Sequence, residues 1–393
     1  MKNYRTLLIV VPRLVSYGFL RKLCGALVAN GVEVHVATSS VSLGEEEVPV
    51  PAEGVKIHYI DFPRGMNPYA HLRAARALKQ LVGMLRPDIV HAHFSAAIFT
   101  TAVARTSRWP VAHATFHGVS FLAMRGWKAM LLRAMETWAA RRFDTAWVLN
   151  DDDRDGLERA APRATVRKLP GFGVGCDLEK FVPVSAAERA TIRTEIGIAP
   201  KDVVFVFSGR FVHFKGFADV ASAFLSLSET NPHARLLLIG VRDRLHPTGL
   251  SAEEERAMKG SPQIIDIGFR NDVERYLPAA DVLVFPSRRE GMPVCAMEAL
   301  AVGVPVITCD ARGCREVVRD GVDGLVLRDA CIPNLRAAMQ LVLDDRSLRQ
   351  RWSAAALAGR KRFSRAHFIT EQTHIYERLF RTSPTSPLPA SSC

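Results

Sequence analysis

Two series of short apolar runs, separated by a zone rich in Gly and Pro, limit the folds open to this chain. In each series, apolar runs that suit buried strands alternate with helical or loop sequence. The first series has strands expected at 6–11, 32–37, 55–60, 87–91, 109–115 and 145–149, with helices at 19–29, 68–85 and 127–142. The second has strands expected at 202–208, 234–240, 263–267, 281–286, 305–309 and 324–327. This alternation predicts two α/β domains, each Rossmann-like, that face each other across a ligand cleft.

Chain length and the Gly- and Pro-rich zone set the expected domain boundaries. At 393 residues, the chain exceeds what one ordinary core accommodates. The zone at 170–200 is interpreted as a linker, which gives domains at 1–175 and 176–364. The Ser-, Pro- and Thr-rich segment 382–393 is expected to be a disordered tail.

Positive charge is concentrated in the first half of the chain. Residues 1–175 hold 23 Lys and Arg against 14 Asp and Glu, so they carry +9 of the net charge of +12. A basic half suits an anionic partner such as a membrane surface, a lipid diphosphate or a nucleic acid. Simple solubility explains the charge equally well. No nucleic-acid-binding motif accompanies it, so we expect no nucleic-acid partner.

The cysteines and the apolar runs indicate the compartment. The seven cysteines show no CxxC pair and no repeated spacing, so neither a zinc site nor a disulfide framework is expected. Free thiols are typical of a reducing cytoplasm. No uninterrupted apolar stretch approaches the roughly 20 residues of a membrane span. We therefore expect a cytoplasmic protein, soluble or peripheral at the inner face of the cell membrane.

The segment from Glu290 to Glu298 carries the strongest functional signal. It follows the apolar run 281–287, which reads as a buried strand, and Pro293 suits the first turn of a helix. A helix that begins past the carboxyl end of a parallel strand presents free amides and a positive dipole end to a phosphate. Glu298 lies one turn in, on the face of Val294, where its carboxylate can accept hydrogen bonds from sugar or ribose hydroxyls.

Arg210 and Lys215 follow the first expected strand of the second half. A forked guanidinium and a point ammonium together suit a diphosphate, whose departure needs charge neutralisation. Taken alone, such a pair is more often a solvated helix start. The glutamates some 75 residues later favour the functional interpretation.

Further segments accompany these residues in a fixed order, at 173–181, 299–307 and 313–326. With the Gly-Arg…Lys-Gly segment at 209–216 and the Glu-Gly…Glu segment at 290–298, the sequence resembles the GT-B glycosyltransferases, specifically the large retaining family 4. The resemblance covers essentially the whole chain and is densest from 170 to 330. It implies the GT-B fold, with a helix at about 365–381 crossing back onto the first domain.

The resemblance implies roles for individual residues of the second half. Arg210 and Lys215 match the positions that grip the donor diphosphate, and Glu290 matches the glutamate that contacts the transferred sugar. Glu298 matches the glutamate that holds the ribose hydroxyls, and Phe269 lies where relatives wrap the base. The segment that places backbone amides on the sugar and phosphates comprises Gly291, Met292, Pro293 and Val294. A nucleophile-and-acid pair, as in glycoside hydrolases, is the less favoured interpretation of the two glutamates.

The first half supplies two further candidates. The segment 114–118 follows an apolar strand and ends at a glycine. Within it, His117 by resemblance points at the transferred sugar and hydrogen-bonds its hydroxymethyl group. A lone strand-end histidine is more often structural. Many relatives have a Gly-Gly loop after the first strand. Here the loop 12–19 contains only Gly18, which is the candidate for close backbone approach.

Two apparent metal motifs are given non-metal interpretations. His91 and His93 alternate onto one strand face, and His113 and His117 are four apart, but no carboxylate or cysteine accompanies them at ligand spacing. The acidic triplet 151–153 follows a strand and suits the first turn of a helix, where acids complement the dipole. We expect neither a metal nor a cofactor.

The segment 124–142 combines apolar residues at helical spacing with lysine and arginine elsewhere. It suits either a helix on an anionic bilayer or a core-facing amphipathic helix. The region 113–153 looks like relatives that extend polyprenyl-diphosphate-linked oligosaccharides. Nucleotide-sugar donor, saccharide or lipid-linked acceptor and anionic membrane surface are therefore the expected partners.

These observations predict a metal-independent, retaining hexosyltransferase that uses a UDP-sugar in bacterial surface polysaccharide or lipopolysaccharide synthesis. A nucleotide-sugar epimerase of GT-B fold is the alternative. A dehydrogenase is disfavoured because no G-x-G-x-x-G follows a strand.

Overall fold

The computed structural model describes residues 5–40, 49–63, 65, 67–241 and 251–382. The chain divides into two compact units, which we describe separately. The first unit consists of residues 1–174 together with 366–393, and the second consists of residues 175–365. The tail expected at 382–393 lies, apart from Thr382, outside the described residues.

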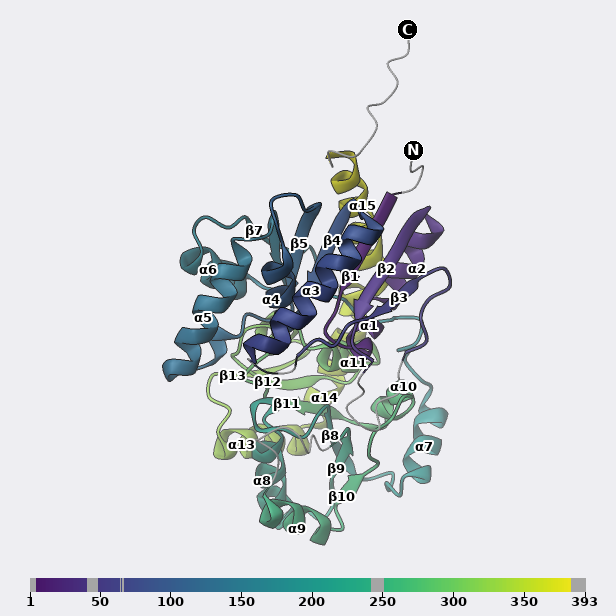
Figure 1. Cartoon of the computed structure of the whole chain (residues 1–393). Helices are drawn as coiled ribbons and strands as arrows, with labels where there is room; N and C mark the ends of the chain where they lie inside the picture. The colour runs from purple at the N-terminus through teal and green to yellow at the C-terminus, as the bar shows by residue number, and fades with distance from the viewer. Residues whose placement is uncertain (1–4, 41–48, 64, 66, 242–250, 383–393) are drawn as a thin grey trace. The chain divides into compact units, whose positions relative to one another are not determined.

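The first unit contains a seven-stranded parallel sheet with the order β3-β2-β1-β4-β5-β6-β7 (Figure 1). Its strands are β1 (Arg5–Val10), β2 (Val32–Thr38), β3 (Lys56–Tyr59), β4 (Ile89–His93), β5 (Val111–Phe116), β6 (Thr145–Val148) and β7 (Val166–Lys168). Its helices are α1 (Leu14–Gly18), α2 (Arg21–Ala29), α3 (Pro68–Leu85), α4 (Ser95–Ala104), η1 (Phe121–Ala123), α5 (Gly126–Ala140) and α6 (Asp151–Ala160). All six expected strands form, and β7 adds a seventh.

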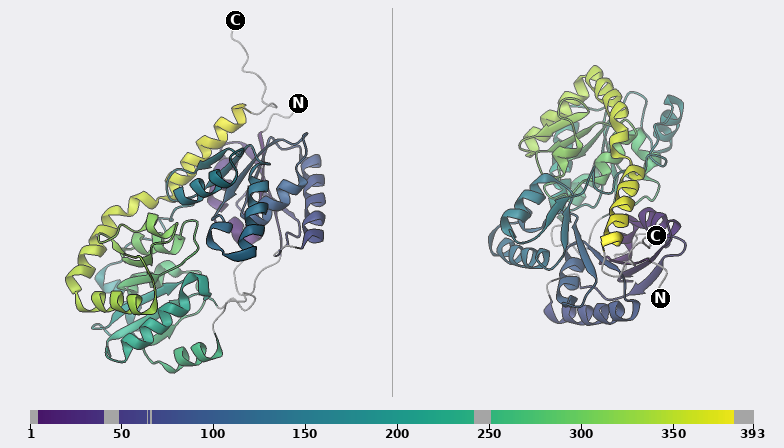
Figure 2. Two further views of the ribbon diagram at one scale, coloured as in Figure 1. Left: turned by 90° about the vertical axis from the view of Figure 1, so that its left-hand side faces the viewer. Right: turned by 90° about the horizontal axis from the view of Figure 1, so that it is seen from above.

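Residue alternation along β4 separates the two faces of this sheet. Val90 and Ala92 belong to the core that α3, α4 and α5 cover. His91 and His93 therefore point to the opposite face, because successive strand residues alternate. There His91 meets Tyr376 of α15 (Arg365–Thr382), the yellow helix of Figure 2. The C-terminal helix thus packs on the sheet of the first unit.

The second unit contains a six-stranded parallel sheet with the order β10-β9-β8-β11-β12-β13. Its strands are β8 (Val203–Ser208), β9 (Ala234–Ile239), β10 (Ile264–Asp266), β11 (Val282–Phe285), β12 (Val306–Cys309) and β13 (Gly324–Leu327). Its helices are α7 (Ala186–Glu195), η2 (His213–Lys215), α8 (Phe217–Ser228), α9 (Ala252–Gly260), α10 (Val273–Tyr276), η3 (Leu277–Ala279), α11 (Val294–Ala301), α12 (Cys314–Val317), α13 (Ile332–Asp344), α14 (Arg346–Gly359) and η4 (Arg360–Phe363). The two parallel sheets confirm the predicted α/β class.

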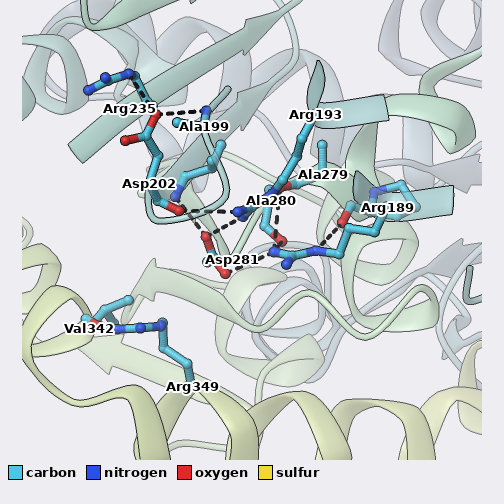
Figure 3. A network of polar contacts seen from close by, with 12 residues as sticks. Arg189, Arg193, Ala199, Asp202, Arg235, Ala279, Ala280, Asp281, Val342 and Arg349 are labelled. Atoms are coloured by element: carbon cyan, nitrogen blue, oxygen red, sulfur yellow. Dashed lines mark hydrogen bonds and ion pairs between the residues drawn. The ribbon is translucent and has the colours of Figure 1, made fainter. Parts of the chain in front are cut away.

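The interpretation of 170–200 as a linker is wrong for its second part, which forms α7. A capping box between Ser185 and Glu188 begins this helix. Figure 3 shows how α7 is fixed to the sheet: Arg189 and Arg193 bind the two oxygens of Asp281 at 2.8 and 2.7 Å. The error arose because α7 is polar on most of its surface, so its attachment by ion pairs leaves no apolar stripe in the sequence.

Most of the apolar residues at helical spacing on α5 are exposed, so the core-facing interpretation is wrong for all of them except Met135, which is half-buried. Trp127 and Met130 are 69% and 74% exposed, and Leu131 and Trp138 are also exposed. In the described part of the chain, no helix is both long enough and apolar enough to cross a membrane.

Candidate active site

The strand order of the second unit brings the predicted donor residues together at the carboxyl ends of its strands. The sheet grows from β8 through β9 to β10 on one side, and from β11 through β12 to β13 on the other. Ligands of open parallel sheets bind outside the carboxyl ends of the strands at such a switch point. Arg210 and Lys215 follow β8, and Glu290 follows β11. The two segments that lie far apart in sequence are therefore neighbours.

Lys215 and Glu290 form an ion pair at these strand ends. The Lys215 Nζ lies 2.5 Å from Oε1 of Glu290, and the two side chains are 18% and 11% exposed. The Ser287 hydroxyl donates to the same oxygen at 2.7 Å. The Lys215 ammonium also lies 5.2 Å from the centre of the Phe285 ring. Both charges are thus held in place by neighbours before any ligand arrives.

A cluster of three cations surrounds the ring of Phe214. Arg210, Lys215 and Arg289 place their charged groups 5.8, 5.8 and 5.9 Å from its centre. Three positive charges in so small a region create a site for a polyanion such as a diphosphate. Arg289 was not among the residues predicted from the sequence. Its position directly before Glu290 was the available signal, because that loop was already expected to reach the switch point.

The loop before α11 depends on close backbone packing. Gly313 has φ of +79°, and a Cβ there would lie 2.7 Å from the carbonyl oxygen of Gly291 and 2.9 Å from that of Glu290. Pro293 is the N-cap residue of α11 and not its first helical residue, and the N-cap makes no side-chain hydrogen bond. Met292 precedes it, and Val294 is the first helical residue. The first amides of α11 are therefore available to a ligand.

Glu298 lies within α11, one turn from its start, and its environment disfavours a charge. Burial raises the pKa of this carboxyl to about 7, although the positive charges of Arg365 and Lys180 oppose the shift. Glu274 adds to it by repulsion. A carboxyl in this state changes its charge near neutral pH, so its ability to accept hydroxyl hydrogen bonds depends on pH there.

Phe269 also lies beyond the carboxyl end of a strand of this sheet. It follows β10, the edge strand, which is two places from β8. The Gly240 amide donates to the Gly268 carbonyl at 2.9 Å, and a Cβ at Gly240 would lie 1.9 Å from the carbonyl oxygen of Gly209. These contacts bring the ends of β8, β9 and β10 together, and Phe269, which is half-buried, adjoins them.

In the first unit, His117 is held by two residues at the end of β4. Its Nε2 lies 3.2 Å from Nδ1 of His93. The ring of Phe94 stacks on it at 4.1 Å with an interplanar angle of 14°. Phe94 has φ of +67°, a conformation that costs a non-glycine residue energy and is concentrated at functional sites. Burial lowers the pKa of His117 to about 4, so its imidazole is neutral at neutral pH.

The remaining histidines of this face form a buried, neutral group. His91 contacts the Tyr376 hydroxyl at 2.6 Å and the Thr115 hydroxyl at 2.8 Å. Its ring stacks on that of His93 at 4.3 Å. Burial lowers the pKa values of His91 and His93 well below their usual range. Among the described residues, no group of three His, Cys, Asp or Glu side chains is arranged to hold a metal.

Two other residues of the first unit have plain structural settings. Gly18 is the last residue of α1, and a Cβ there would meet Pro49 at an ordinary 3.5 Å. Its position therefore does not itself demand glycine. Asp153 is buried in the first turn of α6 and accepts a hydrogen bond from the amide of Val119 at 3.2 Å. The acidic triplet thus begins a helix, as expected, and supports the loop that follows His117.

Comparisons with known proteins agree on fold and family. The models for "Glycosyl transferase 4-like domain" and "Glycosyl transferases group 1" match residues 19–170 and 188–358. The chain is 27% identical over 360 residues to the putative glycosyltransferase EpsD of Bacillus subtilis, covering 88% of this chain and 89% of EpsD. It is 25% identical over 336 residues to the N,N'-diacetylbacillosaminyl-diphospho-undecaprenol alpha-1,3-N-acetylgalactosaminyltransferase of Campylobacter jejuni, covering 84% and 87% of the two chains.

Solved structures show the same arrangement of elements. The sucrose-phosphate synthase of Thermosynechococcus elongatus matches with a TM-score of 0.80 at 19% identity, over 96% of this chain and 100% of that chain. The HepE protein of Anabaena in complex with UDP-glucose matches with a TM-score of 0.77 at 15% identity, over 95% and 100%. The protein is thus a GT-B-fold enzyme, as the sequence predicted. It belongs to the group 1 glycosyltransferases of family 4.

Proposed function

We propose that this glycosyltransferase is a retaining enzyme that moves a hexosyl group from a UDP-sugar to a lipid-linked saccharide. The observation that carries the proposal is the group of three cations around Phe214, beside Glu290 and the uncapped start of α11. This arrangement offers a diphosphate both charge and backbone amides. The family membership makes the diphosphate part of a sugar donor.

Donor and acceptor classes are supported by proteins similar to this one. The Campylobacter jejuni relative and a UDP-Gal:alpha-D-GlcNAc-diphosphoundecaprenol alpha-1,3-galactosyltransferase of Escherichia coli are both named for lipid diphosphate acceptors. The latter is 26% identical over 292 residues. HepE was crystallised with UDP-glucose. Relatives named for transfer also favour transfer over the epimerase alternative.

The proposed reaction proceeds on one face of the sugar. The bond between the anomeric carbon and the diphosphate oxygen breaks as the acceptor oxygen bonds to that carbon from the same side. The departing phosphate oxygen takes the acceptor proton. Arg210 and Arg289 offset the negative charge that develops on the diphosphate, because preorganised cations stabilise it most in the transition state. We propose that no metal takes part.

Glu290 and His117 are assigned to the transferred sugar, and Glu298 to the ribose. The ion pair with Lys215 fixes the Glu290 carboxylate. Sugar hydroxyls can then donate to its second oxygen, Oε2. His117 uses Nε2 for His93, so Nδ1 is the nitrogen it offers to a sugar hydroxyl. Being neutral, the imidazole acts as a hydrogen-bonding group and not as a cation.

An anionic membrane surface is proposed as a further partner through α5. The exposed face of this helix combines Trp127, Met130 and Trp138 with basic residues, among them Lys128 and Arg133. Glu136 is the only acidic residue in α5, and it is buried. Aromatic rings and cations together suit the interface of an anionic bilayer.

The experiment for the proposed function combines donor screening with product analysis. UDP-, GDP- and ADP-sugars are compared by thermal shift, because a bound donor raises the unfolding temperature by mass action. The stabilising donor is then incubated with undecaprenyl-diphosphate-linked saccharides, and the anomeric configuration of the product is read by NMR. Inversion would contradict the retaining mechanism. Isomerised sugar from donor alone would favour the epimerase.

A further inference from the structure

A cavity lies under α5 in the first unit and has no part in the site described above. Its volume is ≈ 150 Å³, and its lining is almost entirely apolar. Helix α5 contributes Leu132, Met135 and Ala139, and α4 contributes Ala96, Ile98 and Phe99. Phe116, the last residue of β5, closes one wall.

The polar groups in the cavity wall already have partners. Glu136 accepts hydrogen bonds from the Ser95 hydroxyl and the Ser120 amide, both at 3.0 Å, and from the Phe121 amide at 3.1 Å. His71 is bonded on both ring nitrogens, to Thr100 and to Gly65. A guest in this space therefore meets hydrocarbon and needs no polar groups of its own.

The size and the position of the cavity suit part of an isoprenoid chain. A protein cavity of about this volume, when lined by apolar side chains, stays dry and binds benzene. About five or six carbons, roughly one isoprene unit, therefore fit. Phe116 is directly followed by His117, so the cavity lies one residue along the chain from a group assigned to the transferred sugar.

Charge complementarity indicates what kind of molecule carries that hydrocarbon. The exposed face of α5 bears cations and aromatic rings, and its one acid faces the cavity wall as a satisfied carboxylate. A molecule with an anionic head and an apolar chain matches both faces of the helix. A neutral sugar matches neither face, and a free nucleotide, although anionic, has no apolar chain for the cavity.

We propose that the cavity under α5 binds a hydrocarbon segment of an anionic, isoprenoid-linked acceptor. This inference rests on the proposed function for the class of acceptor, but hydrocarbon binding in the cavity can be measured without any transfer reaction. The isoprenoid chain does not react, so burying it near His117 would anchor the acceptor. The anchored acceptor then has fewer positions open to its reactive hydroxyl group.

The test uses the full chain and compares filled and unfilled cavities. Ala139→Leu and Ala96→Leu place methyl groups in the cavity, and Ala134→Leu on the exposed side of α5 is the matched control. Farnesyl diphosphate, farnesol, dodecanol and inorganic diphosphate are the calorimetry probes. An unfolding temperature close to that of the wild-type protein reports that each variant is folded. Two filling variants guard against one that does not fold.

We expect both filling variants to weaken farnesyl diphosphate and farnesol binding at least about tenfold, since each buried methylene contributes roughly a factor of four. The Ala134→Leu variant should bind farnesyl diphosphate and farnesol as the wild-type protein does. All the variants should bind inorganic diphosphate with unchanged affinity. Weaker dodecanol binding by the wild-type protein would support a branched chain over an acyl chain, and stronger dodecanol binding would overturn the isoprenoid assignment. If the two filling variants are folded and bind farnesol as tightly as the wild-type protein, or if the wild-type protein does not bind farnesol, the cavity is only a gap in packing.

Failure of the proposed function gives a different pattern. If farnesol binding depends on the cavity but no isoprenoid-linked saccharide is glycosylated, the cavity site stands and the acceptor assignment falls. If transfer occurs with equal KM in wild-type and filled variants, the acceptor class stands and the cavity proposal is overturned.

Discussion

Replacing Glu298 by Gln tests the nucleotide assignment through two effects of opposite sign. The first concerns stability without ligand. Burial raises the pKa of this carboxyl from 4.5 to about 7, so the folded protein disfavours its charged form. Below about pH 4.5, Glu298 is protonated in both the folded and the unfolded protein. As pH rises, burying this carboxyl lowers the free energy of unfolding, and the loss is complete above about pH 7. The neutral amide that Glu298→Gln introduces carries no such cost.

The size of the stability effect follows from the shift. A change from 4.5 to about 7 corresponds to at most roughly 3–4 kcal/mol, at about 1.4 kcal/mol per pKa unit. Glu298 is not completely buried, so solvent screening reduces the expected gain to about 1–2 kcal/mol. Glu298→Gln should therefore be more stable than wild type at about pH 8, and the difference should shrink toward about pH 5. Urea unfolding at several pH values measures it.

The second effect concerns nucleotide binding and has the opposite sign. An ionised carboxylate that accepts hydrogen bonds from the ribose hydroxyls contributes about 1.5–3 kcal/mol, so Glu298→Gln should weaken UDP binding roughly 10- to 100-fold at about pH 8. Because the pKa of Glu298 is about 7, the ratio of wild-type to variant affinity for UDP should fall below that pH by up to tenfold per pH unit. Calorimetry gives the ratio of wild-type to variant affinity at each pH, and this ratio cancels protonation of UDP itself.

These two measurements can refute the reasoning separately. A ratio that does not change with pH would remove the ionised carboxylate from ribose binding. Equal stability of the two proteins at about pH 8 would show that burial does not raise the pKa of Glu298 in solution. Weaker UDP binding by a variant that is more stable is the combination that a binding role requires.

Four further outcomes are expected. Arg210→Ala should lower kcat/KM at least about thirtyfold, which corresponds to roughly 2 kcal/mol of lost transition-state stabilisation, because charged hydrogen bonds to phosphate are lost. Arg289→Ala should lower kcat/KM less. Activity of Arg210→Ala within twofold of wild type would remove the assignment of Arg210. His117→Ala should lower kcat while UDP affinity stays unchanged, and His93→Ala should lower kcat less by freeing the ring of His117; a change in UDP affinity alone would contradict both roles. Asp281→Ala should destabilise the protein by about 3 kcal/mol in denaturant unfolding, since Arg189 and Arg193 lose their partner; an unchanged midpoint would show that the pairs do not hold α7. Activity should persist in EDTA, and its loss, restored by a divalent cation, would refute the metal-free mechanism.

The apolar runs of the sequence were enough to predict most of the strands and the α/β class. Strands buried on both faces of a parallel sheet read as continuous apolar runs, and these runs located twelve of the thirteen strands in the described part of the chain. Helix α3 has the bounds predicted from its pattern, and local chemistry begins it there: the Asn67 side chain caps it and Pro68 is its first residue. The strand β7 was missed because its three residues, of which two are exposed and basic, form no apolar run.

The order of the sheets decided which candidates meet. Spacing along the chain did not reveal that Lys215 pairs with Glu290, because that contact depends on β8 and β11 being neighbours. Nor did it reveal that His93 and Phe94 hold His117, which requires β4 to lie beside β5. Contacts between distant segments are set by strand pairing, which one-dimensional periodicity does not encode.

Burial decided the chemistry of the remaining residues. The sequence identified Glu298 as a carboxyl on a helix, but its pKa near 7 arises from the low polarity of its folded surroundings. Periodicity likewise showed that α5 is rich in apolar residues without showing where they lie. Only the packed unit places Trp127 and Met130 outside and Leu132 and Ala139 around a cavity. Residue type fixes what a side chain can do, and the surroundings it acquires on folding fix which of these properties it expresses.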